Sequence, residues 1–299
     1  MRALQYRSYG GPGVLEVGQA PDVHPTAGTV RVQVRASSVN PMDWKIRAGY
    51  LSDGKPLESP GYPGLDAAGV VDEVGEGVTD VAVGDDVFGL GSATNAEFAV
   101  LQYYARKPAS VDWAAAAAAG VAAETAIRAF ELVGVTNGGT VFIDGGAGGV
   151  GSVAVQIALA RGASVIASAG AGNQDYLREI GATPVLYGDG MVERVRAVAP
   201  DGVDAVFDAA GKTALADLIS LVPAPSKVVT IANFTPGDSG VQLTTGRSPK
   251  ANEALAETAA LLQDNKLVVK FQTFPLDRAA EAHEISQNGH LRGKLVLVP

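Results

Sequence analysis

Hydrophobic residues in the middle of the chain form short apolar runs separated by amphipathic stretches. The apolar run 140–144 leads through a glycine-rich turn into the amphipathic stretch 152–163. Further apolar runs at 163–170, 203–211 and 227–234 are each followed by small residues and then by a helix or loop. Strands that alternate with helices in this way predict a doubly wound parallel sheet of the Rossmann type, with ligand at the carboxyl ends of the strands.

Local signals set the ends of several predicted elements. Gly162 ends the first helix, and Asn173 is expected to be the N-cap of the next one. The segment 241–245 (VQLTT) is predicted to be the last strand of the sheet. An open edge strand can pair with its copy across a two-fold axis, so a homodimer is expected.

The residues that flank this region follow a different pattern. Gly and Pro turns separate short alternating strands at 29–39, 69–75, 85–90 and 96–101, which predict a compact β-barrel-like domain. The six-alanine run 114–119 predicts a helix that bridges the domains, because alanine is the best helix former. The C-terminal segment is expected to return to the first domain through a helix at 249–263, a strand at 267–274, a helix at 277–287 and a strand at 294–298.

Composition excludes several classes of protein. At 299 residues and 47% hydrophobic content, the chain can fill two cores. A net charge of -9 with scattered basic residues argues against an extended nucleic-acid partner. The start of the chain has no apolar leader, and the apolar stretch 113–123 is too short and alanine-rich to span a bilayer. A soluble, cytoplasmic protein with no membrane partner is expected.

Metal chemistry is not expected. The chain contains no cysteine, which excludes disulfides, thiolate catalysis and every cysteine-containing zinc site. Its three histidines, His24, His283 and His290, are too scattered in the sequence to suggest a metal site.

The glycine-rich turn carries the strongest chemical signal. Gly146, Gly148 and Gly151 fit the pattern G-x-G-x-x-G, in which the first glycine permits a tight turn, the second lets the backbone approach a pyrophosphate and the third lets the helix pack on the strand. The phosphates are expected at the helix N-terminus, beside Gly149 and Val150, where unpaired N–H groups and the helix dipole favour negative charge.

Several motifs in order give the chain a family resemblance. They are SSVNPMDWKIRAG (37–49), PGLDAAGVVDEVGEGV (63–78), VGDDVFG (83–89), the glycine turn, FPLDRAAEAHEI (274–285) and GHLRGKLVLV (289–298). The chain resembles the zinc-independent quinone oxidoreductases of the medium-chain dehydrogenase/reductase superfamily. This resemblance implies an α/β protein with a GroES-like β-barrel catalytic domain (1–112 and 248–299), a Rossmann NADPH-binding domain (113–247) and a cofactor cleft between them. It also implies an electron-poor conjugated carbonyl as acceptor.

The chain departs from the zinc-dependent branch of that superfamily. Gly64, Leu65 and Asp66 stand where the zinc enzymes have a Gly-His-Glu segment, and Asn40 takes the position of the catalytic-zinc cysteine. No metal can then polarise a carbonyl as a Lewis acid. An enone or quinone can still accept hydride, because its own conjugation spreads the charge.

The residues beyond the second strand bear on the choice of cofactor. An NAD enzyme places an acid about 20 residues after the glycine turn, but here the segment 168–172 reads SAGAG and the first acid is Asp175. NADPH is therefore predicted, with Ser168 and Asn173 near its 2′-phosphate. No Arg or Lys lies in the segment, and a tyrosine found in some relatives comes one residue early, as Tyr187. Ser168 and Asn173 as plain polar loop residues are the alternative.

The resemblance assigns further residues to the nicotinamide end. Tyr50 and Asn40 are the candidate catalytic residues, and Tyr50 could hydrogen-bond the acceptor oxygen as charge develops on it. Asp43 as a helix N-cap or surface charge, Arg47 as its (i, i+4) partner and Tyr50 as a half-buried aromatic are the alternatives.

The remaining cofactor candidates follow predicted strands or match a family segment. Thr125 matches a family threonine at the nicotinamide end, Ala210 follows the third apolar run, and Asn233 and Phe234 follow the fourth. For Phe234 a core position is the favoured alternative. The predicted function is NADPH-dependent, metal-free hydride transfer to a quinone or another α,β-unsaturated carbonyl. An enoyl or enone reductase of a biosynthetic pathway, and a non-catalytic NADPH-binding structural or sensor protein, are the alternatives.

Overall fold

The computed structural model describes residues 1–289 and 291–299, which form two units. The barrel unit comprises Met1–Val121, Lys250–Gln263 and Val269–Pro299, and the Rossmann unit comprises Ala122–Pro249 and Asp264–Val268. The division falls within helix α2 (Trp113–Val133), which contains the alanine run. The domain limits expected from the sequence, at 112 and 247, stay predictions.

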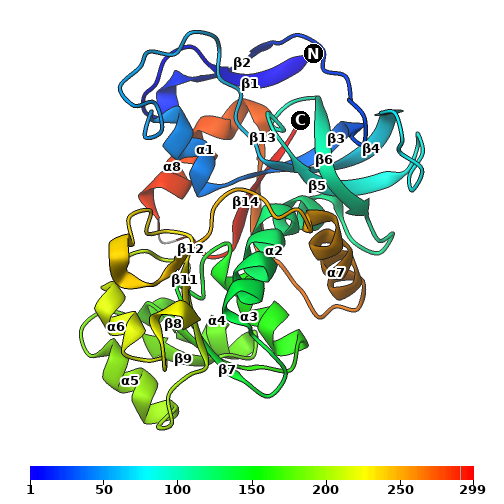
Figure 1. Ribbon diagram of the computed structural model, residues 1–299. Helices are drawn as coiled ribbons and strands as arrows, with labels where there is room; N and C mark the ends of the chain where they lie inside the picture. Colours follow the sequence, from blue (N-terminus) through cyan, green and yellow to red (C-terminus); the bar gives the residue numbers. More distant parts are fainter. Residues whose placement is uncertain (290) are drawn as a thin grey trace. The chain divides into compact units, whose positions relative to one another are not determined.

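The barrel unit is built mainly from antiparallel strands (Figure 1). β1 and β2 form a two-stranded sheet, and six strands form a second sheet in the order β13-β14-β3-β4-β5-β6. An additional pairing of β3 with β6 closes strands β3 to β6 into the expected barrel. The elements are β1 (Arg2–Tyr6), η1 (Pro12–Val14), β2 (Leu15–Gln19), β3 (Val30–Val39), α1 (Pro41–Arg47), β4 (Asp66–Val74), β5 (Asp86–Gly91), β6 (Phe98–Arg106), α7 (Ala251–Gln263), β13 (Phe271–Pro275), η5 (Leu276–Arg278), α8 (Ala279–Asn288) and β14 (Lys294–Val298).

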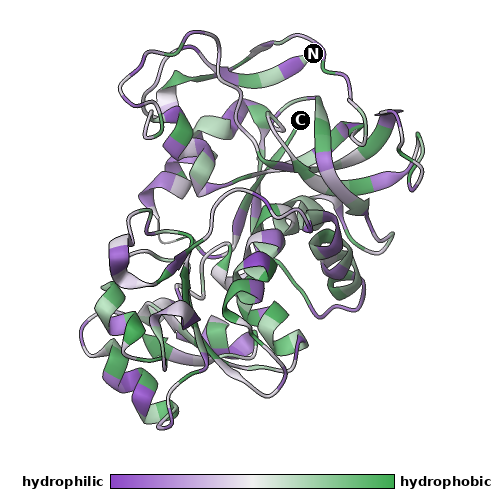
Figure 2. Ribbon diagram, viewed as in Figure 1, coloured by the Kyte–Doolittle hydropathy of each residue, from purple (hydrophilic) through white to green (hydrophobic). Residues whose placement is uncertain are grey.

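Alternation of side chains explains where the core of the barrel lies. Val30, Val32 and Val34 of β3 are buried, while Gln33 and Arg35 between and beyond them are exposed. The barrel sheet carries such hydrophobic and hydrophilic positions side by side (Figure 2). Since successive strand residues point to opposite faces, the valines form one side of the barrel core. That core comprises Val30, Val32, Val34, Ala67, Val71, Val81, Val87, Ala99, Leu101 and Tyr104.

The Rossmann unit contains a six-stranded parallel sheet in the order β12-β11-β10-β7-β8-β9. This order reverses direction at β7, which confirms the doubly wound sheet and places the switch point at the end of β7. The elements are β7 (Thr140–Asp144), α3 (Gly151–Ala160), β8 (Ser164–Ala169), η2 (Ala171–Asn173), α4 (Gln174–Glu179), β9 (Thr183–Leu186), α5 (Met191–Val198), β10 (Ala205–Asp208), α6 (Leu215–Ile219), η3 (Pro225–Lys227), β11 (Val228–Thr230), η4 (Gly237–Ser239) and β12 (Gln242–Leu243).

Several strands are shorter than their apolar runs. β11 ends at Thr230 rather than at Phe234, because the Thr230 hydroxyl accepts the N–H groups of Ala232 and Asn233 and turns the chain. β13 begins only at Phe271, since the N–H of Val268 bonds to the Gln156 side chain instead of a strand. In the part of the chain that the structure describes, no helix has the length and hydropathy needed to cross a membrane.

Candidate functional site

The turn between β7 and α3 is shaped by three glycines with different roles. Gly145 has a φ of +85°, so the left-handed position lies one residue before the predicted triplet. A Cβ on Gly146 would come within 2.6 Å of the Ala167 Cβ, and one on Gly151 within 2.2 Å of the Gly145 carbonyl oxygen. The assignment of the tight turn to Gly146 is therefore wrong: Gly145 makes the turn, whereas Gly146 and Gly151 permit close packing.

Gly148 differs from these glycines. A Cβ there would lie 3.4 Å from the Gly145 oxygen, an ordinary contact, and Gly148, Gly149 and Val150 are all partly exposed. The fold itself does not require glycine at this position. Val150 is the N-cap of α3 and makes no side-chain cap hydrogen bond. The first N–H groups of a helix have no acceptor within it, so this exposed end can bind an anionic group.

Carboxylates stand at the ends of the two central strands. Asp144 ends β7 and Asp208 ends β10, and the two residues are paired in the sheet register. Both are buried, and burial is the main cause that raises the pKa of Asp208. Asp208 accepts the N–H groups of Ala210 (3.0 Å) and Gly211 (2.6 Å). The candidate residue Ala210 is thus held by its backbone at the carboxyl end of β10.

Ser168 is not the loop residue considered in the sequence. It lies inside β8, fully buried, and donates its hydroxyl proton to Asp144. A direct contact of its side chain with a 2′-phosphate is therefore not supported. Asn173 is the N-cap of α4, but its side chain makes no cap hydrogen bond. The segment after β8 carries no acid before Asp175, whose carboxylate is fully exposed and pairs with Arg178.

The residues of the Rossmann unit predicted to lie at the nicotinamide end are found after β11 and within α2. Asn233 follows β11, where its N–H bonds to Thr230 and its side-chain oxygen accepts the N–H of Thr235. Phe234 is 40% exposed, so the core position favoured from the sequence is wrong. Thr125 is buried in α2, next to the buried ion pair of Glu124 with Arg128 (2.9 Å).

In the barrel unit, Asn40 is buried and fully engaged. It is the N-cap of α1, and Asp43 completes a capping box by accepting the Asn40 N–H at 2.7 Å. The Asn40 amide donates to Asp66 at 3.0 Å, and its oxygen accepts from the ammonium of Lys294. With 3% exposure and these partners, Asn40 has no free group for a substrate, so a direct catalytic contact is not supported.

The alternatives for three nearby residues are wrong. Asp43 is neither the N-cap nor a surface charge, since it is buried at the third position of α1, and burial raises its pKa to about 7. Arg47 is buried and donates to Gln287 rather than pairing with Asp43. Tyr50 is 67% exposed and meets the Trp44 ring edge-on at 5.7 Å between ring centroids, so it is not half-buried.

The buried ammonium of Lys294 faces two carboxylates. Desolvation lowers the pKa of Lys294, while the charges of Asp66 and Asp43 oppose that shift. Asp66 also accepts the Ser38 hydroxyl at 2.6 Å and the Val121 N–H at 2.8 Å. Ammonium, amide and carboxylates thus form a connected buried network under the start of α1.

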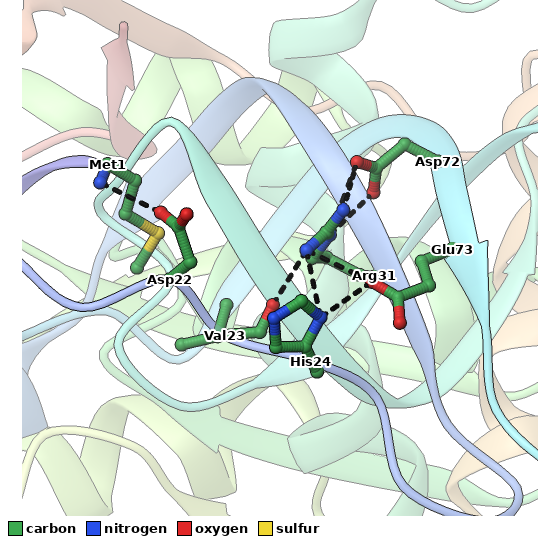
Figure 3. A network of polar contacts seen from close by, with 7 residues as sticks. All are labelled: Met1, Asp22, Val23, His24, Arg31, Asp72 and Glu73. Carbon is green, nitrogen blue, oxygen red and sulfur yellow. Dashed lines mark hydrogen bonds and ion pairs between the residues drawn. The ribbon is translucent and has the colours of Figure 1, made fainter.

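The described histidines lie apart. His24 belongs to a surface network in which Arg31 bridges Asp72 and Glu73 (Figure 3). His283 is fully buried in α8, where desolvation lowers its pKa to about 3. His290 lies outside the described residues. Within residues 1–289 and 291–299, no group of three or more histidines and carboxylates is arranged to hold a metal ion.

The sequence did not predict the residues that shape the site by holding their neighbours in place. These are Gly145, Asp144, Asp208 and Lys294. A signal for the carboxylates was present, because VFID and AVFD both end an apolar run on Asp. Lys294 gave no comparable signal, since a lysine at the start of a strand is usually exposed.

Comparisons with known proteins agree with this architecture. Residues 26–135 match the alcohol dehydrogenase GroES-like domain family, and residues 180–297 match the zinc-binding dehydrogenase family. A chloroplast envelope quinone oxidoreductase homolog of Arabidopsis thaliana is 32% identical, with 100% of this chain and 98% of that protein covered. An NADPH-dependent alkenal/one oxidoreductase of the same plant is 32% identical, with 100% and 80% covered.

A solved structure extends the agreement to the whole fold. A mycobacterial protein in complex with NADPH superposes with a TM-score of 0.86 at 27% identity, and the match covers 100% of both chains. The identity and coverage of the Arabidopsis homolog, together with the barrel and the doubly wound sheet, settle the family. The chain belongs to the quinone oxidoreductase family of the medium-chain dehydrogenase/reductase superfamily.

Proposed function

We propose that this oxidoreductase uses NADPH to reduce quinones or other α,β-unsaturated carbonyls, without a metal. The observation that carries the proposal is the glycine turn with the uncapped start of α3: Gly148 is glycine although the fold leaves room for a side chain. That room is what a pyrophosphate approaching the backbone requires. Relatives named as quinone and alkenal/one oxidoreductases support the acceptor class.

The residues present fit a dinucleotide. The N-terminus of α3 can bind the pyrophosphate. The backbone that follows β10 and β11, at Ala210 and Asn233, is held by hydrogen bonds at the same edge of the sheet. The segment after β8 has no acid to bond the ribose hydroxyls, which favours NADPH over NADH. When bound, the cofactor supplies a hydride, and the chain's task is to orient it and to stabilise charge on the acceptor oxygen.

Metal independence is supported by charge as well as by composition. The chain has no cysteine, and Leu65 offers no ligand atom. At Asn40, the position of a zinc ligand in the resembling enzymes, the side-chain oxygen already accepts from the Lys294 ammonium. A dication beside a buried ammonium would be repelled. An acceptor that spreads charge through its own conjugation needs no Lewis acid.

The first expected result concerns turnover. NADPH oxidation with a small quinone should proceed at the same rate before and after exhaustive chelation, because no step depends on a bound metal. Steady-state absorbance at the nicotinamide band measures this, with a zinc-dependent alcohol dehydrogenase as the positive control for chelation. Activity that disappears and returns only with zinc would refute the metal-free mechanism.

A second expected result, on Tyr50, distinguishes a quinone reductase from an enoyl or enone reductase. With a quinone, Tyr50→Phe should leave turnover within about tenfold, since conjugation already stabilises the charge. With an enone or enoyl thioester, loss of a donor to the developing oxyanion should lower turnover roughly a hundredfold. Rates of both proteins with a quinone, a cyclic enone and an enoyl thioester decide. Unchanged rates on all three would make Tyr50 a packing residue against Trp44.

The third expected result is a homodimer. β12 is the edge strand of the Rossmann sheet, and Leu243 on it is 37% exposed. An unpaired edge can continue into its copy across a two-fold axis. Sedimentation at micromolar concentration should show twice the 30.4 kDa chain mass, and a single 30.4 kDa species would contradict the proposal. A cytoplasmic location stays a prediction from composition.

If the protein binds NADPH tightly but reduces none of these acceptors, the alternative of a non-catalytic structural or sensor protein is favoured. The same turnover assay, combined with a binding titration, distinguishes it from an enzyme. The relatives named as quinone and alkenal/one oxidoreductases favour the enzyme over this alternative.

A further inference from the structure

Hydroxyls and carboxylates form a continuous chain at the carboxyl ends of the central strands of the Rossmann unit. Ser168 in β8 donates to one oxygen of Asp144 at the end of β7, and the Thr213 hydroxyl donates to the other at 2.6 Å. Ser168 is fully buried and Asp144 is 2% exposed. Asp144 is thus a buried carboxylate with a hydroxyl donor on each oxygen.

Ser168 holds the start of the glycine turn. Its hydroxyl oxygen accepts the N–H of Gly145 at 2.9 Å, and its carbonyl oxygen accepts the N–H of Gly146 at the same distance. A hydroxyl has one proton to donate, and here Ser168 directs that proton toward Asp144 in a hydrogen bond. The oxygen's lone pair is therefore directed at Gly145, the residue with a φ of +85° that makes the turn.

Thr213 joins a second loop to the same carboxylate. The N–H of Ala209 bonds to the Asp144 carbonyl at 3.0 Å, and a Cβ on Gly145 would lie 3.1 Å from the Ala210 Cβ. The glycine turn and segment 209–213 therefore lie against each other, and Asp144 is hydrogen-bonded to both through Ser168 and Thr213.

We infer that Ser168 and Asp144 are positioning residues that hold the glycine turn in its pyrophosphate-binding conformation. This rests on the proposed dinucleotide-binding function. Both cofactors carry the same pyrophosphate, so the two residues set the affinity for NADPH and for NADH alike. A serine that instead contacted the 2′-phosphate would affect NADPH alone, and a serine that only supported the fold would change neither affinity.

The test compares Ser168→Ala with Ser164→Ala, a matched control at the exposed first position of the same strand. Titration calorimetry measures both dissociation constants. In Ser168→Ala they should rise by one common factor of about ten, the value of a hydrogen bond to a charged group. The KM for NADPH should rise with kcat unchanged, and the Gly145 and Gly146 amides should exchange hydrogen faster. Ser164→Ala should match the wild type.

Asp144→Asn keeps the shape of the side chain and provides the same test if Ser168→Ala fails to fold. It should again raise both dissociation constants together. Weaker binding of NADPH alone, or unchanged constants in a protein that is merely less stable, overturns the inference. Wild-type protein that binds neither cofactor refutes the proposed function and this inference with it. Wild-type binding with unaffected variants refutes the inference only.

Discussion

Gly148→Val is expected to abolish binding of NADPH and NADH while leaving the protein folded. The fold has room for a Cβ at this position, 3.4 Å from the nearest atom, so we expect the turn to keep its backbone conformation. The methyl groups of the valine would instead occupy the space through which a pyrophosphate approaches the backbone. We expect both dissociation constants to rise by at least about a hundredfold. The wild-type protein is expected to bind NADPH more tightly than NADH by roughly one to two kcal/mol.

Calorimetric titration measures this effect, and circular dichroism confirms the fold. Gly11→Val is the matched control, because a Cβ at Gly11 meets nothing within 4 Å and its φ is -70°. Gly151→Val is the opposite control: its Cβ would lie 2.2 Å from a backbone oxygen, so it should fail by misfolding. Binding by Gly148→Val at wild-type affinity would show that the phosphates do not lie on this turn.

Lys294→Met is expected to lower the free energy of unfolding by about 3 to 5 kcal/mol, the usual cost of leaving a buried charge without its counter-charge. Lys294 is 3% exposed and faces Asp66 and Asp43. Methionine has a similar length but no charge, so the Asn40 oxygen loses its donor and the carboxylates lose their counter-charge. Urea titration followed by circular dichroism measures the change.

The effect should depend on pH. Burial raises the pKa of Asp43 to about 7, so this carboxyl is mostly neutral at pH 5 and mostly charged at pH 8. The uncompensated charge of Asp43 exists mainly at the higher pH, so the loss of stability should be larger there. The side chain of Lys266 is 61% exposed, and its ammonium lies 3.5 Å from Asp264. Lys266→Met should therefore cost less than about 1 kcal/mol at either pH. A loss for Lys294→Met as small as this would contradict a structural role for the buried ammonium.

A double variant tests the coupling directly. Asp43→Asn combined with Lys294→Met removes a charge of each sign, and should be less destabilised at pH 8 than the sum of the two single variants. Additive losses would mean that the two charges do not interact.

Local sequence determined the elements of the site that depend on neighbours along the chain. The apolar run 140–144, the glycines after it and the following helix are all set by hydrophobic spacing and by backbone freedom, and the structure shows them as β7, the turn and α3. Gly162, with a φ of +82°, ends the helix as predicted. The alternation of strands and helices also predicts the doubly wound parallel sheet, which the structure confirms.

Only the tertiary structure decided what the side chains at the strand ends do. Thr230 shortens β11 because its hydroxyl accepts the N–H groups of Ala232 and Asn233. Ser168 is withdrawn from the cofactor because its hydroxyl donates a hydrogen bond to Asp144 on the adjacent strand. These partners come from other elements of the fold, so no spacing along one segment reveals them.

Lys294 shows the same limit for two residues far apart in the sequence. The pattern KLVLV predicted the strand 294–298 correctly, and a lysine at its start is normally solvated. The antiparallel register, with Leu295 opposite Val39, brings Lys294 beside Asn40 and thus among buried carboxylates. The sequence determined that these segments are strands and the start of a helix. The register of the strands depends on the whole sheet, and it decided that a lysine and an asparagine 254 positions apart form one buried hydrogen bond.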